Sequence, residues 1–286
     1  ASDDKSNPVD TKTSKRKIDS LNKSKAYEFS LNNITKQKGL RIASLNVNSL
    51  LKHIDEIRIM LSNHVFDVFA INESKIDPSI SDSEIDILGY KCIRKDRNRF
   101  GGGVVIYVRE HIPFHDRNDL VSEKLEMICI EIERPYSKSI LLSAWYRPPN
   151  SVSDILNEYE LFLFKCDIEC KEMIIMGDLN CDLGKSPPDI ITSKIISLNR
   201  LYQMVNLINE PTRVTETSAS TIDLILSNTP ENIVSSGVSH VGISDHSLIY
   251  AIRKFAFPKS KSTVREVRDF KHFSDRDFYN DLLQVP

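Results

Sequence analysis

The sequence lacks an uninterrupted apolar run of about 18 residues, the length that a membrane-spanning helix needs, so we predict no membrane segment and no membrane partner. Its N-terminal region is polar and basic and has no apolar core, so no secretory signal is predicted. It also lacks an excess of positive charge, because the net charge is −2. Any polyanion-binding site must therefore come from a local cluster of Lys and Arg.

Cysteine is scarce and odd in number, with five residues in 286. This favours reduced thiols in an intracellular, reducing compartment. A zinc site built from Cys166, Cys170 and Cys181 is disfavoured, because a fourth ligand is missing nearby and the first two cysteines fall in a helical pattern.

The composition, with 40% apolar and 27% charged residues, is typical of a globular protein. Residues 1–39 are polar and basic without a sustained period, which predicts a flexible N-terminal arm. Residues 40–256 are expected to form the folded domain. The chain turns polar again in residues 257–286.

The hydrophobic pattern predicts about ten strands and three helices without a strict βαβ rhythm. The strands are expected at residues 40–47, 65–71, 90–93, 104–108, 127–132, 140–145, 173–176, 220–226, 233–238 and 248–252, and the helices follow Ser49 and cover about 152–168 and 193–205. This predicts an α+β fold, a four-layer α/β sandwich in which two packed, mainly antiparallel sheets are flanked by helices.

One stretch combines a buried strand with polar side chains at its end. The apolar run 173–176 stops at Gly177, and Asp178 and Asn180 follow. Because residues two apart in an extended segment point to the same side, a carboxylate and a carboxamide are expected side by side. Such a pair can hold a water and a phosphate oxygen, although Asp and Asn are also ordinary turn residues.

Two further pairs of polar residues indicate chemistry. Asp223 interrupts an apolar run, and a buried carboxylate is costly unless it is paired. His246 is its expected partner, since a carboxylate on one ring nitrogen fixes the tautomer of the imidazole. Glu73 and Asp245 offer the oxygen ligands that magnesium prefers. Together these residues predict metal-assisted hydrolysis of a phosphodiester.

The order of six short motifs resembles the endonuclease/exonuclease/phosphatase superfamily, which includes DNase I-like nucleases and apurinic/apyrimidinic endonucleases. The resemblance covers about residues 40–256. The motifs are Asn46-Val47-Asn48, Asn72-Glu73-Ser74, Tyr146-Arg-Pro-Pro149, Gly177-Asp-Leu-Asn180, Thr221-Ile-Asp223 and Ser244-Asp-His246.

Finer features resemble the endonuclease domains of non-LTR, LINE-type retrotransposons. They are a basic segment leading into Gly101-Gly-Gly103, the run Trp145-Tyr-Arg-Pro-Pro149 and the segment 220–226. Residues 257–286 are similar to the connector that precedes a reverse transcriptase in such polyproteins. The resemblance therefore implies a reverse transcriptase on the same polyprotein and a nuclear location.

The resemblance also implies roles for the matching residues. Glu73 would hold Mg²⁺, with Mn²⁺ as an alternative ion and Asp245 nearby. Asp178 would orient or deprotonate the attacking water, or protonate the leaving oxygen. Phosphate binding is implied for Asn46, Asn180 and Tyr146. His246, oriented by Asp223, would bind a non-bridging oxygen or act as a base. Apurinic endonucleases usually carry Asp where this chain has Asn48, so Asn48 is the weakest of the expected metal ligands.

A cluster of basic residues predicts contact with duplex DNA. Segment 91–99 holds five cations against one acid, Asp96, and Arg147 lies in the motif after a strand. The predicted DNA-binding residues are Lys91, Arg94, Lys95, Arg97, Arg99 and Arg147. The alternative is a charged loop that faces only solvent.

The expected function is a magnesium-dependent endonuclease that nicks one strand of duplex DNA. The nick would leave a 3′-hydroxyl that primes target-primed reverse transcription. Alternatives are an abasic-site repair nuclease or a phosphatase of the same superfamily, or an inactive DNA-binding module. The complete set of carboxylates and the histidine argue against the last of these.

Overall fold

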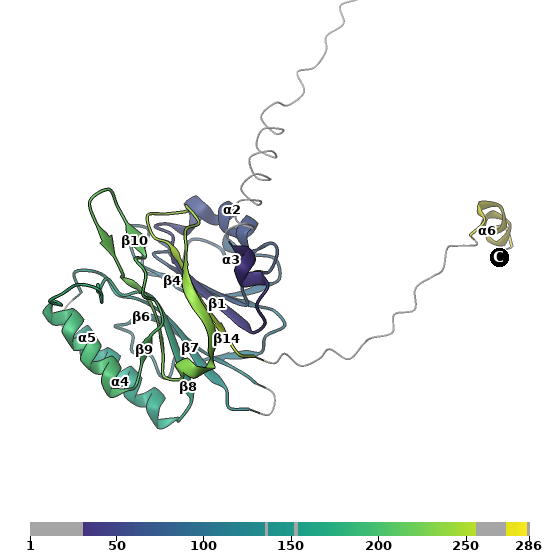
Figure 1. The fold of residues 1–286 in the computed structure, drawn as a ribbon. Helices are drawn as coiled ribbons and strands as arrows, with labels where there is room; N and C mark the ends of the chain where they lie inside the picture. The colour runs from purple at the N-terminus through teal and green to yellow at the C-terminus, as the bar shows by residue number, and fades with distance from the viewer. Residues whose placement is uncertain (1–30, 135–136, 152–153, 256–272, 285–286) are drawn as a thin grey trace, which may run out of the picture. The chain divides into compact units, whose positions relative to one another are not determined.

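The computed structural model describes residues 31–134, 137–151, 154–255 and 273–284. Within residues 31–255, two six-stranded sheets are flanked by helices on their outer faces (Figure 1). This arrangement confirms the predicted four-layer sandwich.

The first sheet has the strand order β13-β14-β1-β2-β4-β3. Its neighbours are antiparallel, except that β1 and β2 run parallel. The strands are β1 (Leu40–Asn46), β2 (Val68–Asn72), β3 (Tyr90–Lys95), β4 (Val104–Arg109), β13 (Ile233–Ser239) and β14 (Leu248–Arg253).

The second sheet has the order β5-β6-β7-β8-β12-β9, and again one neighbouring pair, β7 and β8, runs parallel. Its strands are β5 (Phe114–Asp116), β6 (Glu126–Ile132), β7 (Ile140–Tyr146), β8 (Glu172–Asp178), β9 (Val205–Asn206) and β12 (Asp223–Ser227). A separate hairpin consists of β10 (Arg213–Val214) and β11 (Ala219–Ser220). Both sheets are mainly antiparallel, as the sequence predicted.

The helices form the two outer layers. Helices α2 (Leu50–Leu61) and α3 (Asp82–Ile85) contribute to the core outside the first sheet, and α4 (Ile155–Ile168) and α5 (Ile190–Leu201) pack outside the second (Figure 1). A 3₁₀ helix, η1 (Pro230–Asn232), precedes β13. Helix α2 buries residues at helical spacing, among them Leu50, Ile54, Ile57 and Leu61.

The alternation of side chains along each strand decides which residues face the other sheet. In β1, Ala43 and Leu45 join the core beneath the helices, so Ser44 and Asn46 point to the inter-sheet side. In β8, Met173 and Ile175 lie under α4 and α5, which turns Asp178 inward. Polar residues at strand ends therefore gather between the two sheets.

The folded region begins earlier than the predicted boundary at residue 40. Residues 31–35 are helical, and Leu31 and Ile34 are buried in the core of the first sheet. Their spacing of three places both on one helix face, which explains why part of the predicted arm is ordered. Residues 1–30 of that arm lie outside the described residues.

The predicted connector 257–286 is only partly described, because residues 256–272 lie outside the described part. Helix α6 (Asp275–Leu282) is capped by the Ser274 hydroxyl, which accepts a hydrogen bond from the Asp277 amide. The comparison with a polyprotein connector stays a prediction.

Several predicted boundaries differ from the structure. Asp223 is the first residue of β12 and does not interrupt it, although its side chain is buried as expected. Helix α5 occupies 190–201 and not 193–205, because Asp189 accepts from the Thr192 amide and starts the helix earlier. The region before β3, for which no helix was predicted, contains α3, whose capping box is formed by Ser81 and Glu84.

All five cysteines are free thiols. Among the described residues, no helix has both the length and the apolar character needed to cross a membrane.

Candidate active site

The predicted catalytic residues come from strands whose ends meet at one edge of the sandwich. Because β1 and β2 are parallel, and β7 and β8 are parallel, the carboxyl ends of each pair lie together. Strand β12 is antiparallel to β8 and begins where β8 ends. The residues at these ends are Asn46, Glu73, Tyr146, Asp178 and Asp223.

Asn46 connects the two sheets at the centre of the site. Its buried amide Nδ2 donates to Glu73 Oε1 at 3.0 Å and to Asp178 Oδ2 at 2.8 Å. Its Oδ1 accepts from the Asn48 amide at 3.1 Å. Since the amide has two N–H donors and both are used, one side chain fixes two carboxylates relative to each other.

Glu73 is held as an ionised carboxylate. The Tyr146 hydroxyl donates to Oε1 at 3.1 Å, and the Lys75 ammonium lies 3.0 Å from Oε2. Burial opposes ionisation, but the hydrogen bonds from Asn46, Lys75 and Tyr146 and the charge of Lys75 outweigh it and lower the pKa of Glu73. Glu73 also has a positive φ of 51°, a strained backbone conformation that is concentrated at functional sites.

The backbone of Asp178 is positioned across the sheet interface by Asn72. The Asp178 amide donates to Asn72 Oδ1 at 3.2 Å. The preceding Gly177 has φ 139°, and a Cβ there would lie 2.1 Å from the Trp145 carbonyl oxygen. Only glycine permits this close approach, so the glycine of the motif sets the position of the carboxylate that follows.

Asp223 and His246 form the predicted hydrogen bond. His246 Nδ1 lies 2.9 Å from Asp223 Oδ2, and the Thr212 hydroxyl donates to the same oxygen at 2.7 Å. The other ring nitrogen, Nε2, is 4.0 Å from Asp178 Oδ2. Asp223 thus orients an imidazole that faces the Asp178 carboxylate.

Burial and neighbouring charges shift the pKa values of Asp178 and His246. Asp178 and Asp223 are direct partners in the β8–β12 register, and burial together with the Asp223 charge raises the pKa of Asp178 to about 7. Burial lowers the pKa of His246, but the hydrogen bond and charge of Asp223 outweigh it and raise that pKa overall. Near neutral pH, Asp178 can therefore give or accept a proton, and His246 holds its proton to a higher pH than an ordinary histidine.

Asn180 and Arg147 support the turn that carries Asp178. The Asn180 amide N–H donates to Asp178 Oδ1 at 2.9 Å, and its side chain donates to the Arg147 carbonyl at 3.0 Å. Arg147 is only 3% exposed, and its guanidinium donates to the carbonyls of Leu179 and Asn180 and to Ser151. The Arg147 guanidinium is therefore used inside the protein, which disfavours the predicted contact with DNA, and that contact stays a prediction.

Asp245 and Asn48, the other expected metal ligands, have partners in the structure. The Asp245 carboxylate accepts from Arg213 at 2.8 Å, and its side chain is 41% exposed. Asn48 Oδ1 accepts from the Lys75 ammonium. The metal-binding roles of both residues stay predictions.

Two sites are candidates for holding a divalent cation: the group Asp178, Asp223 and His246, and the carboxylate of Glu73. Ligand atoms of Asp178, Asp223 and His246 lie within 4.8 Å of one another, the one such acidic or histidine group in the described part of the chain. In that group Asp223 and His246 already bond to each other. Glu73 fits a metal better, because it is ionised, partly exposed and already attracts a cation. A divalent ion there would supply Lewis acidity toward a phosphate oxygen.

The basic side chains of segment 91–99 are less free to contact DNA than the sequence indicates. Arg94 donates to Asp96, Asp82 and the carbonyls of Asp77 and Ile80, so its guanidinium is already used within the protein, and its contact with DNA stays a prediction. Asp96 is the acid already present in segment 91–99, whereas the fold brings Asp82 and the carbonyls of Asp77 and Ile80 from outside the segment.

The other cations of the segment are paired but more accessible. Arg97 bonds Glu126 at 2.6 Å, Lys95 lies 3.8 Å from Glu123, and Lys91 lies over the Phe114 ring. Arg99 bonds Asp77 at 2.7 Å and is 56% exposed. Their contact with DNA stays a prediction.

Sequence reasoning missed three supporting residues: Asn72, Lys75 and Thr212. Lys75 had a signal, because it lies two residues after Glu73. Asn72 and Thr212 act through contacts that only the fold creates, between strands or between a loop and a strand.

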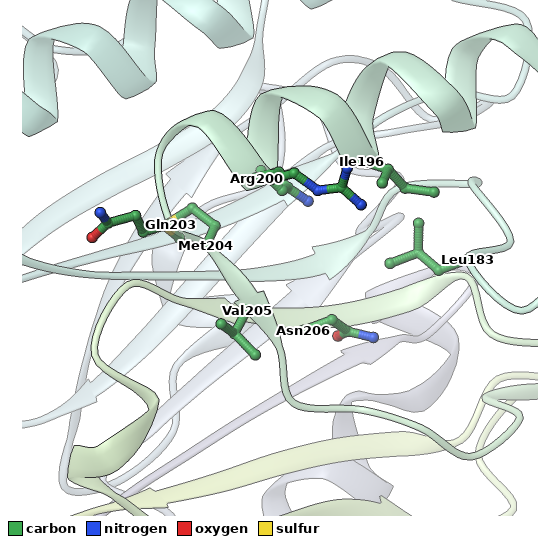
Figure 2. Close-up of a pocket in the computed structure, with 8 residues that line it drawn as sticks. Leu183, Ile196, Arg200, Gln203, Met204, Val205 and Asn206 are labelled. Atoms are coloured by element: carbon green, nitrogen blue, oxygen red, sulfur yellow. The ribbon is translucent and has the colours of Figure 1, made fainter.

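A pocket of about 430 Å³ lies away from these residues, between α5, β9 and the loop containing Leu183 (Figure 2). It is lined by Leu183, Ile196, Asn199, Arg200, Gln203, Met204, Val205 and Asn206. Since these side chains include none of the predicted catalytic groups, the hydrogen-bonded cluster at the strand ends is the stronger candidate for chemistry.

Comparison with known families decides the membership of this chain. The Endonuclease/Exonuclease/phosphatase family matches residues 43–246. The chain belongs to this family. It is thus a member of a family of hydrolytic nucleases and phosphatases, and the match covers every predicted catalytic residue. Comparison with curated proteins gives no match.

Solved structures of nucleases share the fold of this endonuclease/exonuclease/phosphatase family member. The endonuclease domain of TRAS1, a telomere-specific non-LTR retrotransposon, aligns at 16% identity with a TM-score of 0.60, covering 75% of this chain and 98% of that one. An AP endonuclease from Archaeoglobus fulgidus aligns at 18% identity and 0.60, covering 75% and 99%. A 3′-5′ exonuclease from Neisseria meningitidis aligns at 13% and 0.62, covering 75% and 100%. At these identities the likeness establishes the fold.

Replacing His246 with Ala should lower the rate of phosphodiester hydrolysis by about 10²–10⁴-fold, the usual loss of an acid–base or oxyanion-binding group. His115→Ala, at an exposed histidine on β5, is the matched control and should keep full turnover. Asp223→Asn should also lower the pKa of His246, measured by NMR titration, because the carboxylate that stabilises the imidazolium is gone. Full turnover in a folded His246→Ala protein would contradict the assignment.

Proposed function

We propose that this protein is a magnesium-dependent endonuclease that nicks one strand of duplex DNA and leaves a 3′-hydroxyl. The observation that carries the proposal is the Asn46 amide, which holds Glu73 and Asp178 together beside the Asp223–His246 pair. This combination offers an ionised metal ligand, a carboxyl group with a pKa near neutrality and an oriented imidazole. Each of the three can contribute to phosphodiester hydrolysis.

In this proposal the residues divide the work between the ion, the water or leaving oxygen, and the phosphate. Glu73 would hold the ion, and the Asn46 and Tyr146 donors keep its carboxylate in place. Asp178 accepts the proton of the attacking water or donates one to the leaving oxygen. The His246 imidazolium, oriented by Asp223, stabilises negative charge on a non-bridging oxygen.

Duplex DNA is the proposed substrate because an exposed basic and aromatic loop adjoins the site. Phe100 is 95% exposed, and the neighbouring Arg99 is 56% exposed. The loop is attached to the catalytic segment, since the Ser74 and Lys75 amides donate to the carbonyls of Gly103 and Gly102. An arginine beside an exposed ring suits a phosphate backbone and its bases.

The retrotransposon role is part of the same proposal. One solved structure with this fold is the endonuclease domain of a non-LTR retrotransposon, and the motifs around Gly101–Gly103 and Trp145–Pro149 resemble that branch. The 3′-hydroxyl would then prime synthesis by a reverse transcriptase of the same polyprotein, in the nucleus. Because a shared fold alone does not establish function, the retrotransposon role is tested by whether the protein nicks intact DNA.

An abasic-site nuclease is the second candidate, because an AP endonuclease shares the fold. The two candidates use the same catalytic residues and differ in the DNA they cut. A phosphatase would act on terminal phosphates only. A DNA-binding module without activity would need none of the hydrogen bonds that hold Glu73 and Asp178.

In Mg²⁺, the protein should convert supercoiled plasmid that lacks abasic sites to the open-circular form, and excess chelator should stop the reaction. Glu73→Gln removes the charge of the metal ligand and should lose most activity, whereas Glu133→Gln, at an exposed acid beyond β6, should not. Gel electrophoresis measures all three. Cleavage confined to abasic DNA would favour the abasic-site nuclease. Undiminished cleavage in excess chelator would exclude the metal-dependent mechanism.

Arg99→Ala should weaken binding of duplex DNA and reduce the slope of log affinity against log salt by roughly one unit for one lost phosphate contact. Arg134→Ala serves as the control, because Arg134 lies before β7, at the end opposite Tyr146. Fluorescence anisotropy at several salt concentrations measures both. An unchanged slope would mean that Arg99 only bonds Asp77.

A further inference from the structure

The Lys75 ammonium occupies a cation position inside the site. Its Nζ lies 3.0 Å from Glu73 Oε2 and also donates to Asn48 Oδ1. The backbone holds the residue there, because the Lys75 amide donates to the Gly102 carbonyl at 3.0 Å. Only about 20% of the side chain is exposed. The ammonium is therefore a largely buried contact within the site and differs from an exposed surface charge.

We propose that Lys75 is a resident counter-cation that a divalent ion must displace from Glu73 before the site can act. The inference rests on the proposed metal-dependent function. Glu73 Oε1 already accepts from Asn46 and Tyr146, so Oε2 is its freer oxygen, and that oxygen faces the ammonium. A magnesium ion needs direct contact with a carboxylate oxygen at about 2.0–2.1 Å, and an ammonium on the same oxygen competes with it.

Asn48 makes this competition stronger than an aspartate would. Its amide oxygen binds the ammonium without adding negative charge. The local charge of Glu73 and Lys75 is therefore zero, and an arriving dication meets no net attraction from the pair. An aspartate at position 48 would leave one net negative charge and would favour the dication.

A bound substrate would add the negative charge that the neutral Glu73–Lys75 pair lacks. A phosphodiester adds one negative charge beside Glu73, which attracts both the ion and the displaced ammonium. The flexible lysine stem lets the ammonium move to a phosphate oxygen while Asn48 remains its neighbour. Divalent ion and DNA should therefore bind cooperatively, and each should raise the affinity for the other by the same factor.

The test measures Mn²⁺ binding to the DNA-free protein by electron paramagnetic resonance of the free ion. Lys75→Met keeps the apolar stem but removes the charge, and it should tighten Mn²⁺ binding by about tenfold or more. Asn48→Asp should also tighten it. Lys75→Arg keeps the charge and should bind Mn²⁺ as weakly as the unchanged protein. Lys138→Met, before β7 at the end opposite Tyr146, is the matched control and should change nothing.

A second measurement adds duplex DNA with a non-hydrolysable backbone. The DNA should tighten Mn²⁺ binding in the unchanged protein and should do so less in Lys75→Met. Circular dichroism and the unfolding temperature establish that each variant is folded. Equal or weaker Mn²⁺ binding by folded Lys75→Met would overturn the inference, even if the protein nicks DNA as proposed. Absence of Mn²⁺ binding to the unchanged protein with DNA present would instead overturn the metal-dependent function itself.

Discussion

The structure depends on one side-chain amide that joins two sheets. Asn46 stands at the end of β1 and donates to Glu73 from its own sheet and to Asp178 from the other. Both carboxylates lie at the sheet interface, where a charged group without hydrogen bonds is costly. Because one amide satisfies both, the distance between the proposed metal ligand and the proposed acid–base group is set by the packing of the two sheets.

The same interface places two carboxylates close together, and their repulsion changes the protonation of one of them. The β8–β12 register places Asp178 opposite Asp223, and like charges in facing positions are unfavourable. Two features relieve this: His246 and Thr212 bind Asp223, and the raised pKa of Asp178 lets it carry a proton near neutrality. The fold tolerates this arrangement because it is stabilised elsewhere by the apolar cores under the helices.

The sequence predicted most of the sandwich and the central cluster for physical reasons. Strand periodicity is local, so the strands of both sheets followed from it. A buried carboxylate needs a partner, which led from Asp223 to His246. The availability of long basic side chains was harder to predict. Arg94 and Arg147 looked available because their acceptors, such as the carbonyls of Asp77 and Leu179, come close only in the folded chain. The helical residues 31–35 were missed because two buried apolar residues in a polar segment give too little periodicity.

The central claim is that water attacks the phosphodiester so that the 3′ oxygen leaves and the phosphate stays on the 5′ side. The most direct measurement is to nick intact plasmid, remove the protein and offer the product to a DNA polymerase with labelled nucleotides, without phosphatase treatment. Plasmid carrying a 3′-phosphate nick is the control that cannot be extended. The account predicts extension from every nick. Nicks that are extended only after phosphatase treatment would contradict it.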